Sequence, residues 1–224
     1  TLFNKLNFDL KYVLQDISGL KENDVTWIEL DLGLIGSFDF PLMKMGNGNT
    51  LDLFTIEDLT LFSYYWVKRN ISGIFVDIGA NIGLHSAVAF KCGLKVVAFE
   101  PSPSTYKIGK DFLSKVSTSI KFINPLEAKT AFVQDCSCYI EAAVSNSDGI
   151  GDFIQLNDNP FGNHLSGKKK SVYGSINQLK VTLVSLFHLS KPNSVIKIDA
   201  EGTDADILES LITNRTKLNN STVF

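Results

Sequence analysis

The chain has 224 residues, of which 44% are hydrophobic and 20% charged, a composition typical of a globular protein with one large core. Its 21 basic and 24 acidic residues leave a net charge of -3, which argues against nucleic acid as a partner. No apolar run approaches the roughly 20 residues that a membrane-spanning helix needs, so no membrane span is expected within the chain.

The first 70 residues predict a β-hairpin and a helix that lead into the main domain. Residues 27–32 alternate between apolar and polar side chains, as a half-buried strand does. Residues 38–45 and 51–54 flank Gly46-Asn-Gly-Asn49, whose residue types tolerate the positive φ of a hairpin turn. A helix is expected at 56–68. We therefore treat residues 1–70 as an N-terminal unit.

From residue 71 onward the pattern alternates between strands and helices. Strands are predicted at 74–78 and 95–100, and helices at 82–91 and 104–115. This alternation predicts an α/β domain over residues 71–224 with a Rossmann-like, mostly parallel sheet covered by helices on both faces.

The remainder of this domain predicts further elements of the same kind. They are a third strand at 138–144, a β excursion at 150–156 and 181–187, a strand at 195–198 and a helix at 205–211. Residues 157–171, rich in Asn, Gly and Lys, are expected to form a loop. Residues 221–224 resemble the opening of another strand, so we expect a sheet that is truncated at its C-terminal end.

A group of ligand-binding residues is predicted where the first strand of the alternation ends. Asp77 lies at the carboxyl end of that strand, the place where open parallel sheets bind ligands. Gly79 and Gly83 allow a tight turn and a close approach of the backbone to a ligand. Asn81 adds a donor and an acceptor, and the start of the next helix favours a carboxylate.

Glu100 closes the second strand, roughly 20 residues after Asp77, the interval expected for an acid that accepts hydrogen bonds from a ribose diol. Together these residues fit a nucleoside that carries an amino-acid tail, with its ammonium near Asp77. A dinucleotide is the alternative. It is disfavoured because the stretch Gly79-Ala-Asn-Ile-Gly83 lacks the middle glycine of a pyrophosphate-binding turn, and Asp77 would repel the phosphates.

Four motifs together resemble the FkbM-type methyltransferases in order and spacing. They are Val76-Asp-Ile-Gly-Ala-Asn-Ile-Gly83, Phe99-Glu-Pro-Ser-Pro103, Ala142-Ala-Val-Ser145 with Asp148-Gly149, and Ile196-Lys-Ile-Asp-Ala-Glu-Gly202. The resemblance covers about residues 74–212. It implies a class I methyltransferase fold, S-adenosyl-L-methionine as the cofactor, and methyl transfer that is typically to oxygen. Within these motifs it adds Ala80 and Ala143 to the residues expected to bind the cofactor.

The chain also departs from the family pattern. Lys110-Asp-Phe-Leu113 stands where an asparagine is common, and Asp204 stands where a glutamate is usual. An aspartate common before the last motif is also missing near Val184-Ser185. These departures keep an alternative open, a non-catalytic module that retains the fold and the cofactor.

The residues expected to act on a methyl acceptor follow the strand at 195–198. Methyl transfer from a sulfonium depends mainly on alignment and exclusion of water, but a hydroxyl acceptor must also lose a proton. Asp199 and Glu201 project to the same side as Lys197, a combination that could orient or deprotonate the acceptor. Asp204 and Asp206 are interpreted instead as acids that begin a helix.

The identity of the acceptor is not encoded in these motifs. A small molecule, a sugar or a lipid all fit, because acceptor pockets are built from variable loops. No metal site is expected, since Cys136 and Cys138 have no further ligands at a recognisable spacing. A cytoplasmic location is expected, although the first residue, Thr1, leaves the start of the natural chain open.

Overall fold

The computed structural model of the chain describes residues 24–45, 48–70, 73–128, 136–156, 163–167, 175–189, 192–213 and 219–224. Most of the loop expected at 157–171 therefore lies outside the described residues. No helix in the described ranges combines the length and the apolar character needed to cross a membrane.

The central sheet has six parallel strands in the order β14-β13-β5-β6-β8-β7. The strands are Ile74–Ile78 (β5), Lys95–Phe99 (β6), Lys121–Ile123 (β7), Cys138–Ile140 (β8), Val195–Ile198 (β13) and Thr222–Val223 (β14). Every residue of β5 is buried, as expected for a strand covered on both faces. The parallel sheet predicted from the alternation is confirmed, and residues 221–224 do contain a strand.

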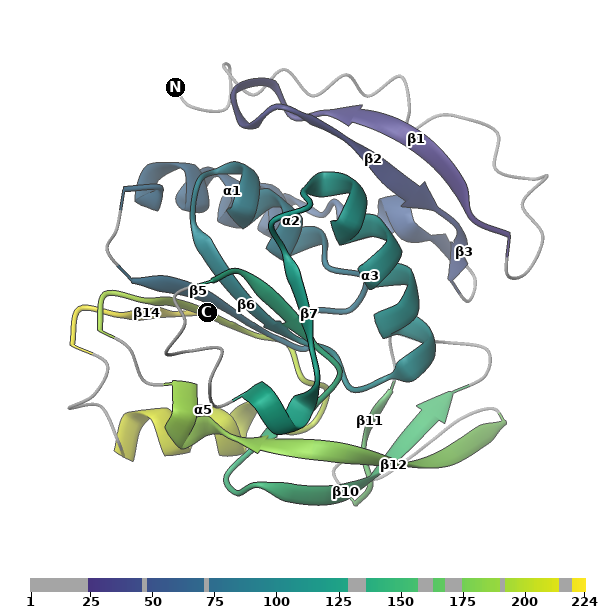
Figure 1. The fold of residues 1–224 in the computed structure, drawn as a ribbon, viewed down its shortest axis with the longest axis vertical. Coiled ribbons are helices and arrows are strands. Elements are labelled where there is room, and N and C mark those ends of the chain that lie inside the picture. The colour runs from purple at the N-terminus through teal and green to yellow at the C-terminus, as the bar shows by residue number, and fades with distance from the viewer. Residues whose placement is uncertain are drawn as a thin grey trace.

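Helices cover both faces of this sheet (Figure 1). They are Ile56–Lys68 (α1), Leu84–Lys91 (α2), Pro103–Val116 (α3) and Asp204–Thr213 (α5). The first three share one hydrophobic core with Phe75, Val96 and Ala98 of the sheet. Helix α5 packs on the opposite face, where Ile207 and Leu211 join a second core. Alternate residues of each strand therefore face the two layers.

Local capping explains why the helix boundaries were predicted closely. Helix α1 begins after Thr55, whose hydroxyl accepts from the Asp58 N–H while the Asp58 carboxylate accepts from the Thr55 N–H. Helix α3 begins after Ser102 and has Pro103 in its first turn. The predicted helix at 56–68 matches α1 at both ends, and the other helices differ from their predictions by one or two residues.

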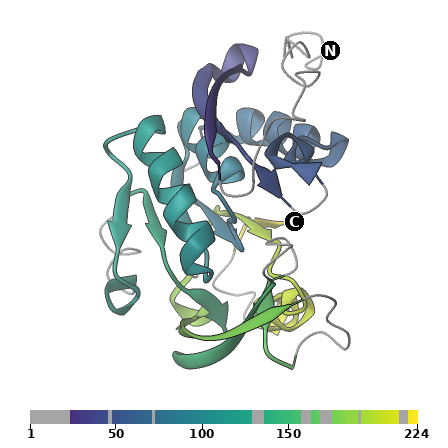
Figure 2. The same ribbon diagram turned by 90° about the vertical axis from the view of Figure 1, so that its right-hand side faces the viewer.

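The N-terminal hairpin differs from the prediction. Thr26–Asp31 (β1) pairs with Ser37–Leu42 (β2), and only the short strands Lys44–Met45 (β3) and Gly48–Asn49 (β4) flank the predicted turn. Residues 51–54, expected to be a strand, lie instead mostly in the 3-10 helix Thr50–Leu53. The Asn49 side chain accepts from the Leu51 N–H, which bends the chain into that helix. The β1–β2 hairpin lies against α3 (Figure 2).

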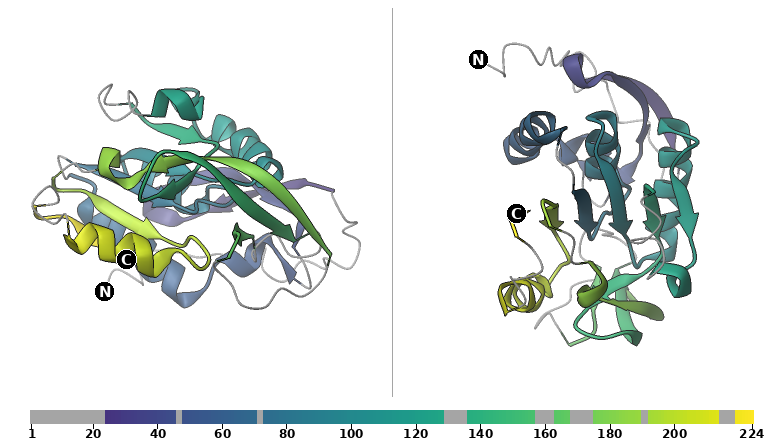
Figure 3. Two further views of the ribbon diagram at one scale, coloured as in Figure 1. Left: turned by 90° about the horizontal axis from the view of Figure 1, so that it is seen from below. Right: turned by 60° about the vertical axis from the view of Figure 1, so that its left-hand side comes forward.

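A second sheet lies beyond the carboxyl ends of the central strands, beside α5 (Figure 3). Its strands, in the order β11-β10-β12-β9, are Ala143–Ser145 (β9), Gly149–Leu156 (β10), His164–Leu165 (β11) and Ile176–Ser185 (β12). The single strand predicted at 138–144 is therefore wrong, because it divides between the two sheets. The Ala142 N–H donates to the Ile140 carbonyl at 3.0 Å, which turns the chain between β8 and β9.

Candidate functional site

A cavity of about 170 Å³ lies between the carboxyl ends of the central strands and the second sheet. On the side of the central sheet it is lined by Ile78, the last residue of β5, by Glu100, which follows β6, and by Asp199, which follows β13. Phe153 of β10 lines the opposite side. The cavity therefore occupies the edge at which parallel α/β sheets bind ligands.

The turn after β5 is held by its own backbone hydrogen bonds. The N–H groups of Gly79 and Ala80 both donate to the Phe99 carbonyl, and the Gly83 N–H donates to the Ala80 carbonyl. The Asn81 N–H donates to Oε2 of Glu100 at 3.0 Å. The turn is therefore rigid before any ligand binds, and its amides are already engaged.

Both glycines of the turn are required by the fold itself. Gly79 has φ +76°, and a Cβ there would lie 2.0 Å from the Asp199 carbonyl oxygen. Gly83 has φ +87°, and a Cβ there would press on the Leu113 side chain at 3.0 Å. The two glycines were expected to allow the approach of a ligand, but in the structure they are required by the neighbouring backbone after β13 and by α3.

Asn81 is held in the left-handed conformation at φ 52° from two sides. Its carbonyl accepts from the Tyr139 hydroxyl at 2.6 Å, and its Oδ1 accepts from the Ile82 N–H at 2.7 Å. Tyr139 is fully buried and lies against Gly109 of α3, where a Cβ would meet its hydroxyl at 2.5 Å. Sequence reasoning missed Tyr139, because its contact joins residues distant in the chain.

Asp77 is completely buried at the end of β5. Its Oδ2 accepts from the Ser86 hydroxyl at 2.7 Å, while its Oδ1 is buried without a hydrogen bond in the described structure. The Lys197 ammonium lies 3.7 Å from Oδ1. Because a buried carboxylate oxygen is strongly destabilised without a donor, Oδ1 is suited to an additional cationic group.

Glu100 is buried directly after β6. Its Oε1 accepts from the Ser102 N–H at 2.8 Å, and its Oε2 accepts from Asn81. Burial raises the pKa of Glu100 to about 7, even though these two backbone hydrogen bonds favour the ionised form. Each oxygen retains a lone pair that could accept from a ligand hydroxyl.

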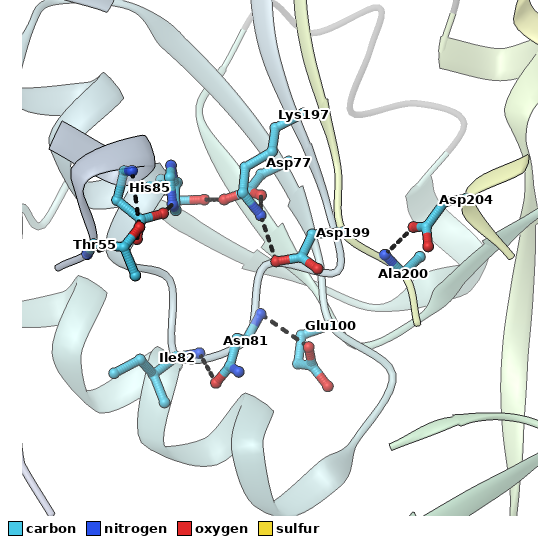
Figure 4. Close-up of polar contacts among 12 residues, drawn as sticks. Thr55, Asp77, Asn81, Ile82, His85, Glu100, Lys197, Asp199, Ala200 and Asp204 are labelled. Carbon is cyan, nitrogen blue, oxygen red and sulfur yellow. Dashed lines mark hydrogen bonds and ion pairs between the residues drawn. The ribbon is translucent and has the colours of Figure 1, made fainter. Parts of the chain in front are cut away.

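Asp77 and Glu100 belong to the same face of the sheet. Asp77 is the register partner of Ala98, and Glu100 lies two residues beyond Ala98. Alternate residues of a strand share a face, so both carboxylates lie on the side of α1, α2 and α3. Figure 4 shows them on either side of the turn that carries Asn81.

A buried polar network joins α1 to α2 behind Asp77. The Tyr65 hydroxyl lies 2.9 Å from Nδ1 of His85, and Nε2 of His85 lies 2.9 Å from Oδ1 of Asp58. Although burial opposes ionisation, the hydrogen bonds from His85 and Thr55 lower the pKa of Asp58. This network fixes His85 near the start of α2, close to Asp77 (Figure 4), and the next residue, Ser86, donates to Asp77.

Lys197 connects Asp77 to the exposed side of the cavity. It is the register partner of Asp77, and its ammonium donates to Oδ2 of Asp199 at 3.2 Å. Burial opposes the charged form, but the carboxylates of Asp77 and Asp199 outweigh it and raise the pKa of Lys197. Lys197 is therefore a cation at neutral pH.

The loop after Asp199 is fixed by the start of α5. The Ala200 N–H donates to Oδ1 of Asp204 at 2.6 Å, and the Thr203 hydroxyl donates to the Ala200 carbonyl at 2.7 Å. Asp204 thus stabilises the helix start, as the sequence reasoning assigned it. Glu201 lies within this loop and lines the cavity.

The structure brings most of the predicted site residues around one cavity. The lining residues among them are Gly79, Asn81, Glu100, Ala143, Asp199 and Glu201. Asp77 and Lys197 lie behind this lining in contact with each other, while Ala80 and Gly83 face the core.

The wall contributed by the second sheet was not anticipated from the sequence. It includes Phe153 of β10, and Asn163 and Leu165 at β11. The pairing of Phe153 with Leu165 had no local sequence signal, because residues 157–162 separate the strands. His164 also lines the cavity and is buried.

One comparison with known proteins matches this chain. Residues 77–220 match the family model described as the methyltransferase FkbM domain. The matched range begins at the buried carboxylate of β5 and includes the cavity residues of both sheets. No curated protein and no solved structure matches the chain.

Proposed function

The chain belongs to the FkbM methyltransferase family, and on this premise we propose that it transfers a methyl group from S-adenosylmethionine to a hydroxyl oxygen of a small molecule, sugar or lipid. The observation that carries the proposal is the pair of buried carboxylates, Asp77 and Glu100, on one face at the ends of adjacent strands. Such a pair suits a ligand with a cationic end and a diol end.

The residues present fit this cofactor. Oδ1 of Asp77 lies behind the cavity lining as a buried acceptor without a hydrogen bond in the described structure, so an ammonium donor that reaches past the lining would satisfy it. Glu100 lines the cavity and retains lone pairs for a ribose diol. Because the amides of the turn are engaged, the carboxylate of the amino-acid tail is assigned to the first turn of α2.

The chemistry requires little from the protein beyond orientation. S-adenosylmethionine supplies an electrophilic methyl group on a sulfonium, and the attacking hydroxyl oxygen must lose its proton during transfer. The rigid turn 79–83 and the cavity between the two sheets would hold the reacting groups in line.

Asp199 and Glu201 are proposed to face the acceptor hydroxyl. Both line the cavity and follow β13. The Lys197 ammonium donates to Oδ2 of Asp199 at 3.2 Å and so fixes the orientation of that carboxylate. We therefore assign proton removal to Glu201, orientation of the hydroxyl to Asp199, and positioning of Asp199 to Lys197.

Calorimetric titration with S-adenosylhomocysteine, the demethylated product, tests the cofactor assignment. We expect saturable binding to the wild type, and a loss of about tenfold or more in affinity for Glu100→Gln, which replaces an ionised acceptor with an amide. Glu29→Gln on the β1–β2 hairpin is the matched control and should bind like the wild type. No heat with the folded wild type at millimolar ligand would contradict the proposal.

A further inference from the structure

The side-chain amide of Asn163 in the cavity wall contains a donor that no residue in the described ranges satisfies. Its Nδ2 atom is buried and has no hydrogen-bond partner there. A buried amide donor without an acceptor destabilises the folded protein. Since native proteins pair almost all such groups, this donor indicates a ligand atom that accepts.

The orientation of this amide is set by the strand beside it. The Leu156 N–H at the end of β10 donates to Oδ1 of Asn163 at 2.8 Å. An N–H group can donate only to the oxygen of the amide, so the oxygen must face Leu156. The NH₂ group is therefore held on the other side of the side chain.

Asn163 lies in the cavity wall directly before β11. In the pairing of β10 with β11, Phe153 pairs with Leu165, and both pack against Ala143 in a small core. All of these residues line the same cavity as Glu100.

The order of the strands indicates which part of the cofactor would reach this wall, an argument that rests on the proposed function. Along the sheet, β5 carries Asp77, β6 leads to Glu100, and β8 leads to Ala142 and Ala143. With the ammonium at Asp77 and the ribose diol at Glu100, the base attached to that ribose extends toward β8. The apolar side chains of Phe153 and Leu165 suit a flat heteroaromatic ring there.

A second contact fixes the hairpin to the ribose side of the cavity. Nε2 of Gln155 donates to the Ser104 hydroxyl at 2.6 Å, at the start of α3. Ser104 lies four residues after Glu100, whereas Asp199 and Glu201 lie on the other side of β5. Asn163 is therefore next to the proposed base position rather than next to the proposed proton acceptor.

We propose that Asn163 is a specificity-determining residue that donates a hydrogen bond from Nδ2 to a ring nitrogen of the adenine base. Adenine offers ring nitrogens as acceptors at its free edges, and the fixed NH₂ group provides the complementary donor. The second sheet thus contributes base recognition in addition to enclosing the cavity.

Asn163→Asp is the variant that separates this role from the structural one. It keeps an oxygen for the Leu156 N–H but replaces the NH₂ donor with a second acceptor. Asn177→Asp is the matched control, because Asn177 is exposed on β12, pairs with Gln155 in the same sheet and receives the same charge. Thermal melting of both variants checks that the sheet is folded.

Calorimetry with S-adenosylhomocysteine should show that Asn163→Asp binds about tenfold more weakly than Asn177→Asp. Analogues in which one ring nitrogen is replaced by C–H identify the accepting atom. One of them should bind the wild type about tenfold more weakly, and Asn163→Asp should weaken its binding little further. The assignment would be overturned if the two variants bound S-adenosylhomocysteine with equal affinity. It would also be overturned if Asn163→Asp weakened the binding of every analogue by the same factor. Absence of binding to the wild type would instead contradict the cofactor itself.

Discussion

The two sides of the cavity differ in how firmly their acidic residues are held. On the proposed cofactor side, the Asp77 side chain has no exposed surface and Glu100 accepts from two backbone amides. On the proposed acceptor side, the Asp199 side chain is 66% exposed and pairs only with Lys197 among the contacts described. The first side is organised before any ligand arrives, which suits a constant ligand. The second can adapt, which suits an acceptor that varies between related enzymes.

The largest expected effect comes from neutralising Asp77, the buried one of the two carboxylates that contact Lys197. Asp77→Asn leaves a buried ammonium without its buried partner and should lower the free energy of unfolding by about 3 kcal/mol. It should also weaken S-adenosylhomocysteine binding about 100-fold, because a charged acceptor is lost. Urea denaturation and calorimetry measure the two effects.

Asp199→Asn is the control for that comparison. It removes the other partner of Lys197 at an exposed position, so it should change the free energy of unfolding by less than about 1 kcal/mol. If both variants lost the same stability, the contrast between the two sides would be wrong.

An effect of comparable size on stability is expected in the rigid turn. Gly79→Ala should lower the free energy of unfolding by several kcal/mol, because its Cβ would lie 2.0 Å from the Asp199 carbonyl oxygen. Gly93→Ala shares a positive φ of +88° but has open space around the added Cβ, so it should cost only about 1 kcal/mol. Equal melting temperatures for the two variants would exclude the close contact between the turn and β13.

A pH effect should be confined to the cofactor side. The pKa of Glu100 is raised to about 7 by burial, and hydroxyl donors of a ligand favour its ionised form. Affinity for S-adenosylhomocysteine should therefore fall as the pH drops below about 7, by up to tenfold per pH unit, and level off above it. Titrations between about pH 5.5 and 8.5 measure this slope, and Glu100→Gln should remove it.

The stability of the protein should depend on Glu100 in the opposite sense. The folded-state pKa lies above the ordinary value of 4.5, so the folded protein binds the extra proton more tightly than the unfolded chain. The stabilisation from this group is complete below about pH 4.5 and is lost as the pH rises through about 7. Comparing denaturation of the wild type and Glu100→Gln across this range isolates it.

The smallest effect is expected on the acceptor side. Glu201→Gln should leave the affinity for S-adenosylhomocysteine within about twofold, because the residue is assigned to the acceptor rather than to the cofactor. Calorimetry checks this directly. A tenfold loss of affinity would mean that Glu201 contacts the cofactor, and the proposed difference between the two sides of the cavity would be wrong.

The elements that could be predicted from the sequence are those with local signals. The strand at 74–78 and the helix at 56–68 match the structure, because continuous apolar character and the Thr55 cap are encoded within the elements themselves. The glycine turn and Glu100 could likewise be placed at one edge of the sheet from their positions after strands.

The elements that could not be predicted depend on distant contacts. The break between β8 and β9 is made by two residues, Glu141 and Ala142, that carry no turn signal. The strand β7 is an edge strand of three residues, too short to show a pattern. The cavity wall at Phe153 and Asn163 forms only when β10 and β11 pair across a long connection. The cavity wall proposed to recognise the base was therefore absent from the sequence prediction, while the two carboxylates were present.

The most direct test of the account is a crystal structure of the protein with S-adenosylhomocysteine. The account predicts one ligand that spans the two βα turns, with its ammonium on Oδ1 of Asp77 and its ribose hydroxyls on Glu100. A ligand bound elsewhere, or one that leaves both carboxylates without contacts to it, would contradict the central claim.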